Sequence, residues 1–371
     1  MMKGKNRYQN PFPGLREFKE DEAHLFFGRE KQIDELLKKL RKSRFLAVLG
    51  ASGSGKSSLI KAGIIPSLYS GFMVEAGSSW NIVLTRPGCD PIGNLSHALT
   101  QNEVFKDSNT DQDILNSIVE TTLRRSDRGL VEIVRQAELD ENENLLIIVD
   151  QFEELFSYNK QSGQAQNGYS VYNTFVNLFL EATRQFNVPV FVILTLRSDF
   201  LGNCSEFHGL PQAINQAQDL IPNMSKEESR RAITGPLAVS GIDITQRLQS
   251  RLLSDLSKIT DQLPVLQFAL KKTVDYWIRL GMHNETLDIK HYEQAGLIPD
   301  VINNYAEKIY REIEDMKSLR IADTVFTMVT DQTNDLNNIR RPTKIRELAE
   351  IAEATPEEAI QVINKFRQPG F

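Results

Sequence analysis

Residues 50–57 constrain the fold of this chain more than any other segment. They read Gly-Ala-Ser-Gly-Ser-Gly-Lys-Ser and satisfy every fixed position of the phosphate-binding pattern G-x-x-x-x-G-K-[ST]. An apolar run at 45–49 precedes them, and a helix start follows from Ser58. Backbone N–H groups of such a loop surround a β-phosphate, and the helix N-terminus adds partial positive charge. The segment therefore predicts a nucleotide triphosphate site, not a flexible Gly/Ser linker.

The residues assigned to nucleotide binding in this loop are Ser52, Gly53, Ser54, Gly55, Lys56, Ser57 and Ser58. In this pattern the lysine neutralises β- and γ-phosphate oxygens, and the hydroxyl that follows it ligates Mg²⁺. Lys56 and Ser57 are therefore expected to hold the triphosphate and the metal ion.

Apolar runs alternate with helical stretches between residues 44 and 224. The strong runs lie at 45–49, 82–85, 145–149 and 189–196, with a weaker one at 220–221. The strong runs are too continuous for half-exposed strands, so they predict buried strands of a parallel sheet. Their alternation with helices indicates an α/β layered fold.

A P-loop needs a second acidic contact to Mg²⁺ at the end of a neighbouring strand. Asp150 directly follows the run at 145–149 and is expected to supply it, although an Asp there is also typical of a simple strand cap. Gln151 follows, so no acid adjoins Asp150. Glu153 and Glu154 come next, and either is placed to orient an attacking water, with Glu154 favoured. Both also suit the first turn of a helix, where carboxylates interact well with the dipole.

Arg197 leaves the next strand at the same sheet edge as Asp150. An arginine there is placed to touch a γ-phosphate, to distinguish ATP from ADP and to stabilise transferred charge. The alternative is a surface arginine paired with Asp199. The five histidines have no metal-ligand spacing, so the Mg²⁺ site is assigned to Ser57 and Asp150.

The composition excludes several other classes of protein. With 371 residues, 40% apolar and 25% charged, the chain is close to an average soluble globular protein and unlike a disordered or collagen-like chain. Its longest apolar stretch, at 145–149, is far shorter than the roughly 20 residues of a membrane helix. Two cysteines and no export signal predict reduced thiols in the cytoplasm. A net charge of −6 gives no bulk argument for nucleic-acid binding.

The chain divides into four expected parts: an N-terminal segment and helix (1–44), the α/β core (45–224), a helical part (225–317) and a compact part of three helices (318–371). A helix is expected from about Arg29. In the third part, a capping box at Ser225 and Glu228 opens a helix that is expected to end near residues 235–236. Further helices of this part are expected at Pro264 and over 300–316.

The last part is expected to hold three helices. One starts at Leu319, the second is capped by Thr343, and the third is capped by Thr355 with Pro356 at its first position and Glu358 at its third.

A combination of segments makes the chain similar to a known family. They are Asn-Pro-Phe-Pro-Gly-Leu-Arg at 10–16, Leu-Phe-Phe-Gly-Arg-Glu at 25–30, the P-loop, Asp-Gln-Phe-Glu-Glu-Leu-Phe at 150–156, Leu-Thr-Leu-Arg-Ser-Asp-Phe at 194–200 and Leu-Pro-Val-Leu-Gln at 263–267. This combination resembles the bacterial novel STAND NTPases, signal-transduction ATPases with numerous domains. It spans nearly the whole chain and implies a P-loop NTPase of the ASCE/STAND type, with a parallel sheet, a helical lid and a winged helix.

The resemblance also implies roles for individual residues. The adenine side is assigned to Phe27, Gly28 and Arg29 in the entry motif and to Pro264, which packs on the base and reports closure. Arg197 matches the sensor arginine, and Glu154, the second acid of its pair, is the favoured base. The family also implies that the strand of Arg197 lies between the P-loop strand and the strand of Asp150.

The family implies a switch that is closed with ADP, opens on a trigger, exchanges to ATP and self-assembles, with slow hydrolysis resetting it. ATP or ADP and Mg²⁺ are the implied cofactors. In bacteria, related proteins couple effectors to repeat-type sensors, and some act in defence against phage. The implied partners are the chain's own C-terminal sensor and further copies on activation, with no membrane.

The chain departs from the family pattern at two places. The chain starts nine residues before the first motif, so no N-terminal effector is expected. It ends at residues 366–371, where a winged helix turns into its β-wing. A strand beginning at the last residue has no partner, which indicates a truncated winged helix and a missing sensor, such as a β-propeller or a helical-repeat array.

Two alternatives stay open. One is a DNA-acting ATPase related to AAA+ or origin-recognition proteins, which also join a P-loop domain, a lid and a winged helix. Residues 320–371 hold seven basic and eight acidic residues, which disfavours direct DNA contact. The other is a nucleotide-binding scaffold without hydrolysis, because Gln151 leaves no acid beside Asp150.

Overall fold

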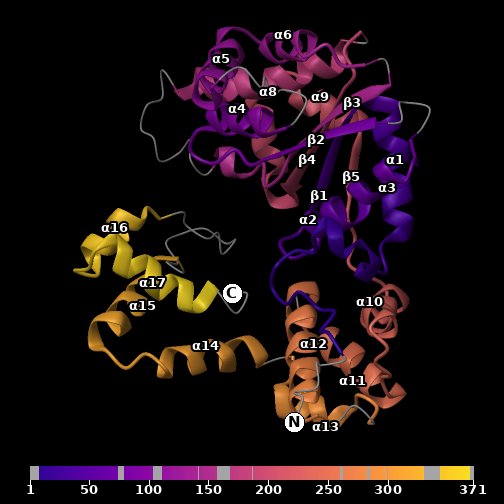
Figure 1. The fold of residues 1–371 in the computed structure, drawn as a ribbon, viewed down its shortest axis with the longest axis vertical. Coiled ribbons are helices and arrows are strands. Elements are labelled where there is room, and N and C mark those ends of the chain that lie inside the picture. Colours follow the sequence, from indigo (N-terminus) through magenta and orange to yellow (C-terminus); the bar gives the residue numbers. More distant parts are fainter. Residues whose placement is uncertain are drawn as a thin grey trace. The chain divides into compact units, whose positions relative to one another are not determined.

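The computed structural model describes residues 8–73, 79–102, 111–140, 142–156, 168–185, 187–259, 262–281, 285–298, 300–329 and 343–367. The chain forms two compact units, whose elements are labelled in Figure 1. The sheet unit comprises Phe18–Ala23 and Arg29–Asn223. The helical unit comprises Met1–Glu17, His24–Gly28 and Met224–Phe371. Within the described ranges, no helix is both long enough and apolar enough to cross a membrane.

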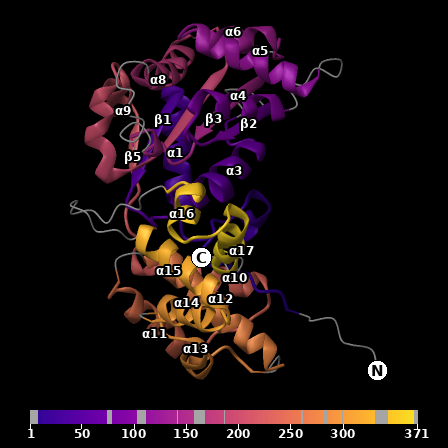
Figure 2. The ribbon, with the colours of Figure 1, turned by 90° about the vertical axis from the view of Figure 1, so that its left-hand side faces the viewer.

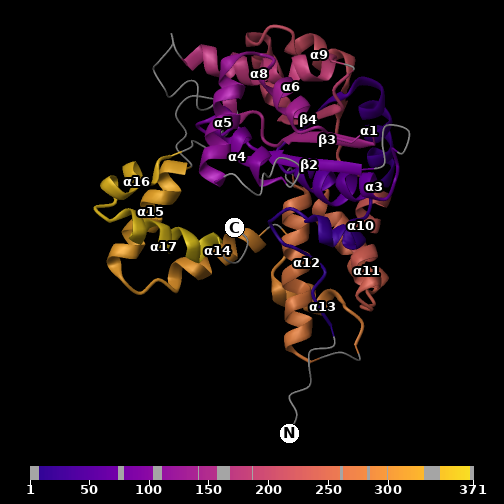
Figure 3. The same cartoon turned by 45° about the horizontal axis from the view of Figure 1, so that its top comes forward.

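The sheet unit is built on a parallel sheet, which is five-stranded over the described residues (Figure 3). Its strands are β1 (Phe45–Gly50), β2 (Ser79–Thr85), β3 (Glu143–Val149), β4 (Val190–Arg197) and β5 (Gln218–Leu220), in the order β2-β3-β4-β1-β5. The four strong apolar runs therefore form β1 to β4, whereas the weaker run at 220–221 overlaps β5 only at Leu220. The expected insertion of the Arg197 strand between the other two is confirmed, because β4 pairs with both β1 and β3.

Helices cover both faces of this sheet, which explains why its strands are continuously apolar. Helices α4, α5, α6, α8 and α9 pack with one face, and α1, η2 and α3 lie on the other (Figure 1). On β3, Leu145, Ile147 and Val149 contribute to the first of these layers. The bounds are η1 (Glu20–Leu25), α1 (Glu30–Ser43), α2 (Lys56–Ser58), η2 (Leu59–Ile64), α3 (Ile65–Tyr69), α4 (Pro91–Gln101), α5 (Gln112–Arg125), α6 (Gly129–Gln136), α8 (Gly168–Arg184), η5 (Ser198–Glu206) and α9 (Leu210–Gln216).

The helical unit contains two apolar cores (Figure 2). The first joins α10 (Lys226–Val239), α11 (Gln246–Leu256), α12 (Gln262–Arg279) and α13 (Ile289–Ala295). The second joins the end of α14 (Val301–Arg311) to α15 (Met316–Val329), α16 (Ile345–Ile351) and α17 (Pro356–Arg367). The segment with the expected β-wing, residues 368–371, lies outside the described residues.

The predicted capping boxes are present, but four helix bounds differ from the prediction. Ser225 with Glu228, and Thr355 with Glu358, exchange reciprocal hydrogen bonds. Helix α10 continues past Pro236 to Val239, because a proline removes only its own N–H, and the Ser240 N–H still donates to the Pro236 carbonyl.

The remaining differences lie in the last 70 residues. The helix expected over 300–316 is divided, because the Asp315 carboxylate accepts the Ser318 N–H and starts α15 at Met316, ahead of the predicted Leu319. The N-cap of α16 is Lys344, one residue after the predicted Thr343. The Lys344 side chain makes no capping hydrogen bond.

The N-terminal segment of the helical unit is hydrogen-bonded to α12. Asn10 donates from Nδ2 to the Lys271 carbonyl oxygen at 2.8 Å and to Asp275 Oδ1 at 2.7 Å. Phe12 is buried in the core formed by α10–α13. The two prolines of this segment exclude a helix, so it lies as an extended strap along α12.

Phe27 packs its ring against Gly235 in α10. A Cβ on Gly235 would lie 2.5 Å from Cγ of that ring, which is closer than side chains approach each other. Next to it, Gly28 has a φ of +88°, and a Cβ there would lie 2.5 Å from the Glu228 carbonyl oxygen. Both glycines are therefore required by the close approach of this segment to α10.

Gly235→Ala is expected to lower the free energy of unfolding by about 1–3 kcal/mol, because the new methyl overpacks against the Phe27 ring. This loss should exceed the gain of up to about 1 kcal/mol that alanine gives in a helix. Gly202→Ala is the control, since a Cβ there meets nothing within 4 Å. Urea unfolding followed by circular dichroism measures both, and a Gly235→Ala variant as stable as the wild type would contradict this packing.

Candidate phosphate-binding site

The loop that follows β1 has the backbone of a phosphate-binding loop. Gly53 and Gly55 have φ values of +69° and +87°, which side chains other than glycine adopt rarely. The chain then runs helically from Lys56 to Tyr69 through α2, η2 and α3. The buried Ser54 side chain explains why residue 50 is a glycine, because a Cβ at Gly50 would lie 2.7 Å from Ser54 Oγ. The free N–H groups at the start of this helical run form an anion site.

Lys56 lies folded over this loop. Its Nζ donates to the carbonyl oxygens of Gly50 and Ala51, both at 2.8 Å. Burial lowers its pKa, and the nearby Glu153 carboxylate opposes that shift. The ammonium is therefore held at the loop by two neutral acceptors.

Asp150 lies at the end of β3 with its carboxylate in direct contact with the P-loop helix. Ser57 Oγ donates to it at 3.0 and 3.1 Å, and Thr195 Oγ1 donates to Oδ1 at 2.7 Å. Asp150 is 2% exposed. A buried carboxylate of this kind needs such donors.

These two residues fit Mg²⁺. A hydroxyl oxygen and a carboxylate in contact beside a phosphate loop are the hard oxygen ligands that this ion prefers, and it takes few protein ligands because phosphates and waters complete its shell. Among the described residues, no group of three or more His, Cys, Asp or Glu side chains is placed to hold a metal ion. The Ser57–Asp150 pair is a candidate metal position because its two side chains are in contact beside the phosphate loop.

A strained turn after Asp150 separates the two glutamates. Gln151 has a φ of +56°, which is uncommon for a residue with a side chain. Its N–H donates to Thr195 Oγ1 at 2.9 Å, and the Phe152 N–H donates to the Thr195 carbonyl oxygen at 2.9 Å. Thr195 on β4 thus supports both this turn and the Asp150 carboxylate.

Glu153 and Glu154 leave this turn toward different neighbours. Glu153 Oε2 accepts the Arg197 N–H at 3.3 Å, and burial raises its pKa while Lys56 and Arg197 oppose that shift. Glu154 Oε2 accepts the Gly88 N–H at 2.9 Å, and burial raises its pKa while Arg86 opposes that shift. Glu153 is therefore the acid whose charge environment includes the P-loop lysine.

The Arg197 guanidinium forms a two-point ion pair with Asp199, at 3.1 and 2.7 Å. It also lies 5.6 Å from the centroid of the Phe200 ring. The pairing with Asp199 that the sequence left open is thus present in this structure. Arg197 still leaves β4 at the sheet edge that holds the P-loop and Asp150.

The adenine-side residues are divided between the two units. Arg29 is 2% exposed, and its Nη2 donates to the carbonyl oxygens of Pro222 at 2.9 Å and Ser54 at 3.4 Å, so it braces the P-loop from inside the sheet unit. Phe27, Gly28 and Pro264 belong to the helical unit. Their contact with adenine stays a prediction.

Two residues at the sheet edge that holds Asp150 were not predicted from the sequence. Thr195 is a polar residue within an apolar strand, and its hydroxyl contacts Asp150. Arg86 follows β2, and its Nη2 lies 3.2 Å from Asp150 Oδ2. The contact of Arg86 depends on the pairing of β2 with β3, whose parallel strands end at the same edge, and this strand order carries no local signal in the sequence.

Thr195→Val is expected to lower the free energy of unfolding by about 2–3 kcal/mol, because a buried N–H and a buried carboxylate oxygen both lose a partner. Thr85→Val is the matched control. Thr85 is also buried at a strand end, but its hydroxyl has no hydrogen-bond partner among the described residues. Valine there should be neutral or stabilising. Urea unfolding compares the two, and equal losses would contradict the role of Thr195.

Similar folds occur among solved structures. The Aeropyrum pernix ORC1 protein in complex with DNA is 11% identical, with a TM-score of 0.51, over 93% of this chain and 84% of that chain. The Aeropyrum pernix ORC2 protein, in its ADPNP–ADP complexes, is 13% identical with a TM-score of 0.49, over 99% and 98%. The likeness to the ORC1 protein, at 11% identity, shows the fold alone, which is an α/β P-loop fold.

No curated protein matches the sequence. The family model described as Novel STAND NTPase 1 matches residues 11–369. The match includes the P-loop, Asp150, the two glutamates and Arg197. The chain therefore belongs to the novel STAND NTPase 1 family and is a P-loop NTPase.

Proposed function

We propose that this chain is an ATP-binding and slowly hydrolysing switch, closed with ADP and open with ATP, that controls oligomerisation and signalling. One observation carries the nucleotide part of the proposal. The Ser57 hydroxyl and the Asp150 carboxylate are in contact beside the P-loop, at 3.0 Å. This is the pairing that a Mg²⁺-nucleotide requires of a P-loop protein.

In this proposal the phosphates bind to the N–H groups of residues 52–58 and to Lys56. Its ammonium exchanges the carbonyl oxygens of Gly50 and Ala51 for phosphate oxygens, which are stronger acceptors because they are charged. Ser57 and Asp150 hold Mg²⁺, which neutralises phosphate charge when it is bound. Thr195 keeps the Asp150 carboxylate aimed at the serine.

We assign the water-orienting role to Glu153, although the sequence and the family favour Glu154. The assignment is supported by the neighbours of each acid. Lys56 and Arg197, the two cations expected at the phosphates, act on Glu153. Glu154 accepts the Gly88 N–H, and the cation whose charge acts on it is Arg86, which follows β2. A base has to lie within hydrogen-bond reach of the attacking water, which favours the acid nearer the P-loop lysine.

Arg197 acts as the sensor in this proposal. Its guanidinium leaves Asp199 when a γ-phosphate is present, because a phosphate carries more charge than one carboxylate. Its backbone N–H meanwhile holds Glu153. One residue thereby couples the γ-phosphate to the orientation of the base.

Glu153→Gln is expected to slow single-turnover ATP hydrolysis by roughly a hundredfold or more, the usual contribution of a general base. Glu154→Gln is the matched control and should stay within a few-fold of the wild type. Quench-flow with radiolabelled ATP measures both rates. The reverse order would assign the role to Glu154. Measurable binding without hydrolysis in the wild type would favour a nucleotide-binding scaffold.

The switch part of the proposal concerns the helical unit. Family membership supports a lid in which Phe27, Gly28 and Pro264 contact adenine and the lid stays closed on ADP. Pro264 lies in the first turn of α12, the helix that the N-terminal strap also contacts. Opening of this lid, a winged-helix role for residues 318–371, a further C-terminal sensor and self-assembly belong to the same proposal.

Pro264→Ala is expected to raise the rate of ADP release several-fold, because the closed lid loses its contact with adenine. Pro356→Ala, at the first position of α17, removes a proline outside the family motif and should leave that rate unchanged. Stopped-flow displacement of a fluorescent ADP measures it. Equal release rates for the Pro264 variant and the wild type would contradict the closure role.

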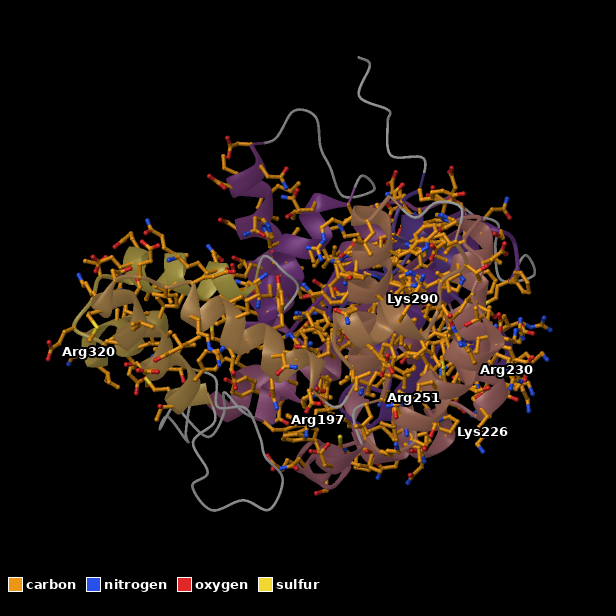
Figure 4. All side chains as sticks on the ribbon, turned by 90° about the horizontal axis from the view of Figure 1, so that it is seen from below. Arg197, Lys226, Arg230, Arg251, Lys290 and Arg320 are labelled. Carbon is orange, nitrogen blue, oxygen red and sulfur yellow. The ribbon has the colours of Figure 1, made fainter. Side chains whose placement is uncertain are left out.

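A DNA-acting ATPase is the second candidate, because one similar structure holds DNA. Four of the basic side chains that Figure 4 labels on the helical unit weigh against it, because each forms an ion pair. Arg230, Arg251, Lys290 and Arg320 pair with Glu227, Asp255, Glu285 and Glu353, respectively. Paired cations are poorly available for phosphate contacts. Salt-dependent retention of a labelled duplex by the purified chain would favour this candidate over the switch.

A further inference from the structure

A cation lies beside Asp150 that the P-loop pattern does not require. Among the strands that the structure describes, β2 is at one edge of the sheet and ends next to β3. Arg86 follows it directly and places Nη2 3.2 Å from Asp150 Oδ2. The Asp150 side chain is 3% exposed, whereas that of Arg86 is 46% exposed. The Arg86 side chain is therefore partly exposed to solvent, although the carboxylate that it contacts is buried.

Arg86 is not needed to aim this carboxylate. The hydroxyls of Ser57 and Thr195 already donate to it at 2.7–3.1 Å. They are neutral, however, and a buried carboxylate is costly without a compensating charge. The specific contribution of Arg86 is thus a positive charge in direct contact with the carboxylate, in addition to the charge of Lys56, which also acts on Asp150.

The backbone around Arg86 is held without its side chain. The Asp150 N–H donates to the Thr85 carbonyl oxygen at 2.9 Å. Asn94 Nδ2 donates to the carbonyl oxygens of Arg86 and Pro87, at 3.3 and 2.9 Å. The Gly88 N–H donates to Glu154. A change of the Arg86 side chain should therefore leave this turn in place.

We propose that Arg86 is the counter-ion of Asp150 in the metal-free site and that it competes with Mg²⁺ for this carboxylate. Its positive charge weakens the hold on Mg²⁺ and thereby eases the release of the metal-bound nucleotide. Arg86 is a positioning residue in this role, because it acts through Asp150. This inference rests on the proposed nucleotide site and adds a means of setting its metal affinity.

The test measures Mg²⁺ affinity in the whole 371-residue chain. The dissociation constant of a fluorescent ADP is measured in EDTA and at rising Mg²⁺, which gives the Mg²⁺ concentration of half-maximal effect. Arg86→Gln should lower that concentration by roughly tenfold, the scale expected when one unit charge next to a divalent ion is removed from a partly solvated site. Arg86→Lys keeps the charge and should behave like the wild type.

Two further variants complete the design. Arg124→Gln is the matched control, because Arg124 pairs with Asp90 and Glu120 in the same unit and not with Asp150. It should leave the half-maximal Mg²⁺ concentration unchanged. Arg86→Met keeps the apolar stem of the side chain without the charge and repeats the test if the glutamine variant does not fold.

The outcomes are distinct. A lower half-maximal Mg²⁺ concentration in Arg86→Gln or Arg86→Met, with Arg86→Lys and Arg124→Gln unchanged, supports the counter-ion role. An unchanged or higher concentration overturns it. A loss of ADP affinity that is equal in EDTA and in Mg²⁺ also overturns it, since Arg86 then contacts the nucleotide. A wild-type chain that binds no ADP overturns the proposed function and this inference with it.

Discussion

The buried carboxylate of Asp150 is the group on which the rest of this site depends. Burying a charge is unfavourable unless donors and cations surround it, and here they come from three other elements. Ser57 belongs to the helical run after the P-loop, Thr195 to β4 and Arg86 to the end of β2. The strand order β2-β3-β4-β1 brings these elements to one edge. The hydrogen bonds and the ion pair of one carboxylate therefore connect the phosphate loop and the candidate metal position, and they depend on the order of the strands.

The arrangement around this carboxylate separates the two glutamates that follow it. The left-handed backbone at Gln151, supported by Thr195, sends Glu153 toward the Arg197 N–H and Glu154 toward the Gly88 N–H. Each acid also has a different cation among its neighbours, Lys56 for Glu153 and Arg86 for Glu154. Their chemistry therefore differs although they are adjacent in the sequence, and this difference underlies the roles that we assign to them.

The sequence predicted those parts that a local pattern determines. The glycines, Lys56 and Ser57 of the P-loop could be assigned because their spacing is that of a phosphate-binding loop. The strands could be assigned because a sheet covered on both faces has continuously apolar strands. The interposed β4 was expected from the family resemblance. Thr195 was missed because one hydroxyl in an apolar strand carries no local signal, and Arg86 because its contact needs the order of the strands. The divergence of Glu153 and Glu154 depends on one backbone angle at Gln151, which no pattern indicates. Residues of the helical unit, such as Pro264, are assigned by family membership alone.

The central claim is that the P-loop of this chain holds an adenine nucleotide in the closed, ADP-bound state. The most direct measurement is to purify the chain without added nucleotide, denature it with acid, and identify and quantify the released nucleotide by ion-exchange chromatography. Retention of ADP by the P-loop predicts stoichiometric ADP from the wild type and almost none from Lys56→Ala, because the loop then lacks the ammonium that binds the phosphates. A folded wild-type chain that releases no nucleotide, and binds neither ADP nor ATP when they are added with Mg²⁺, would contradict it.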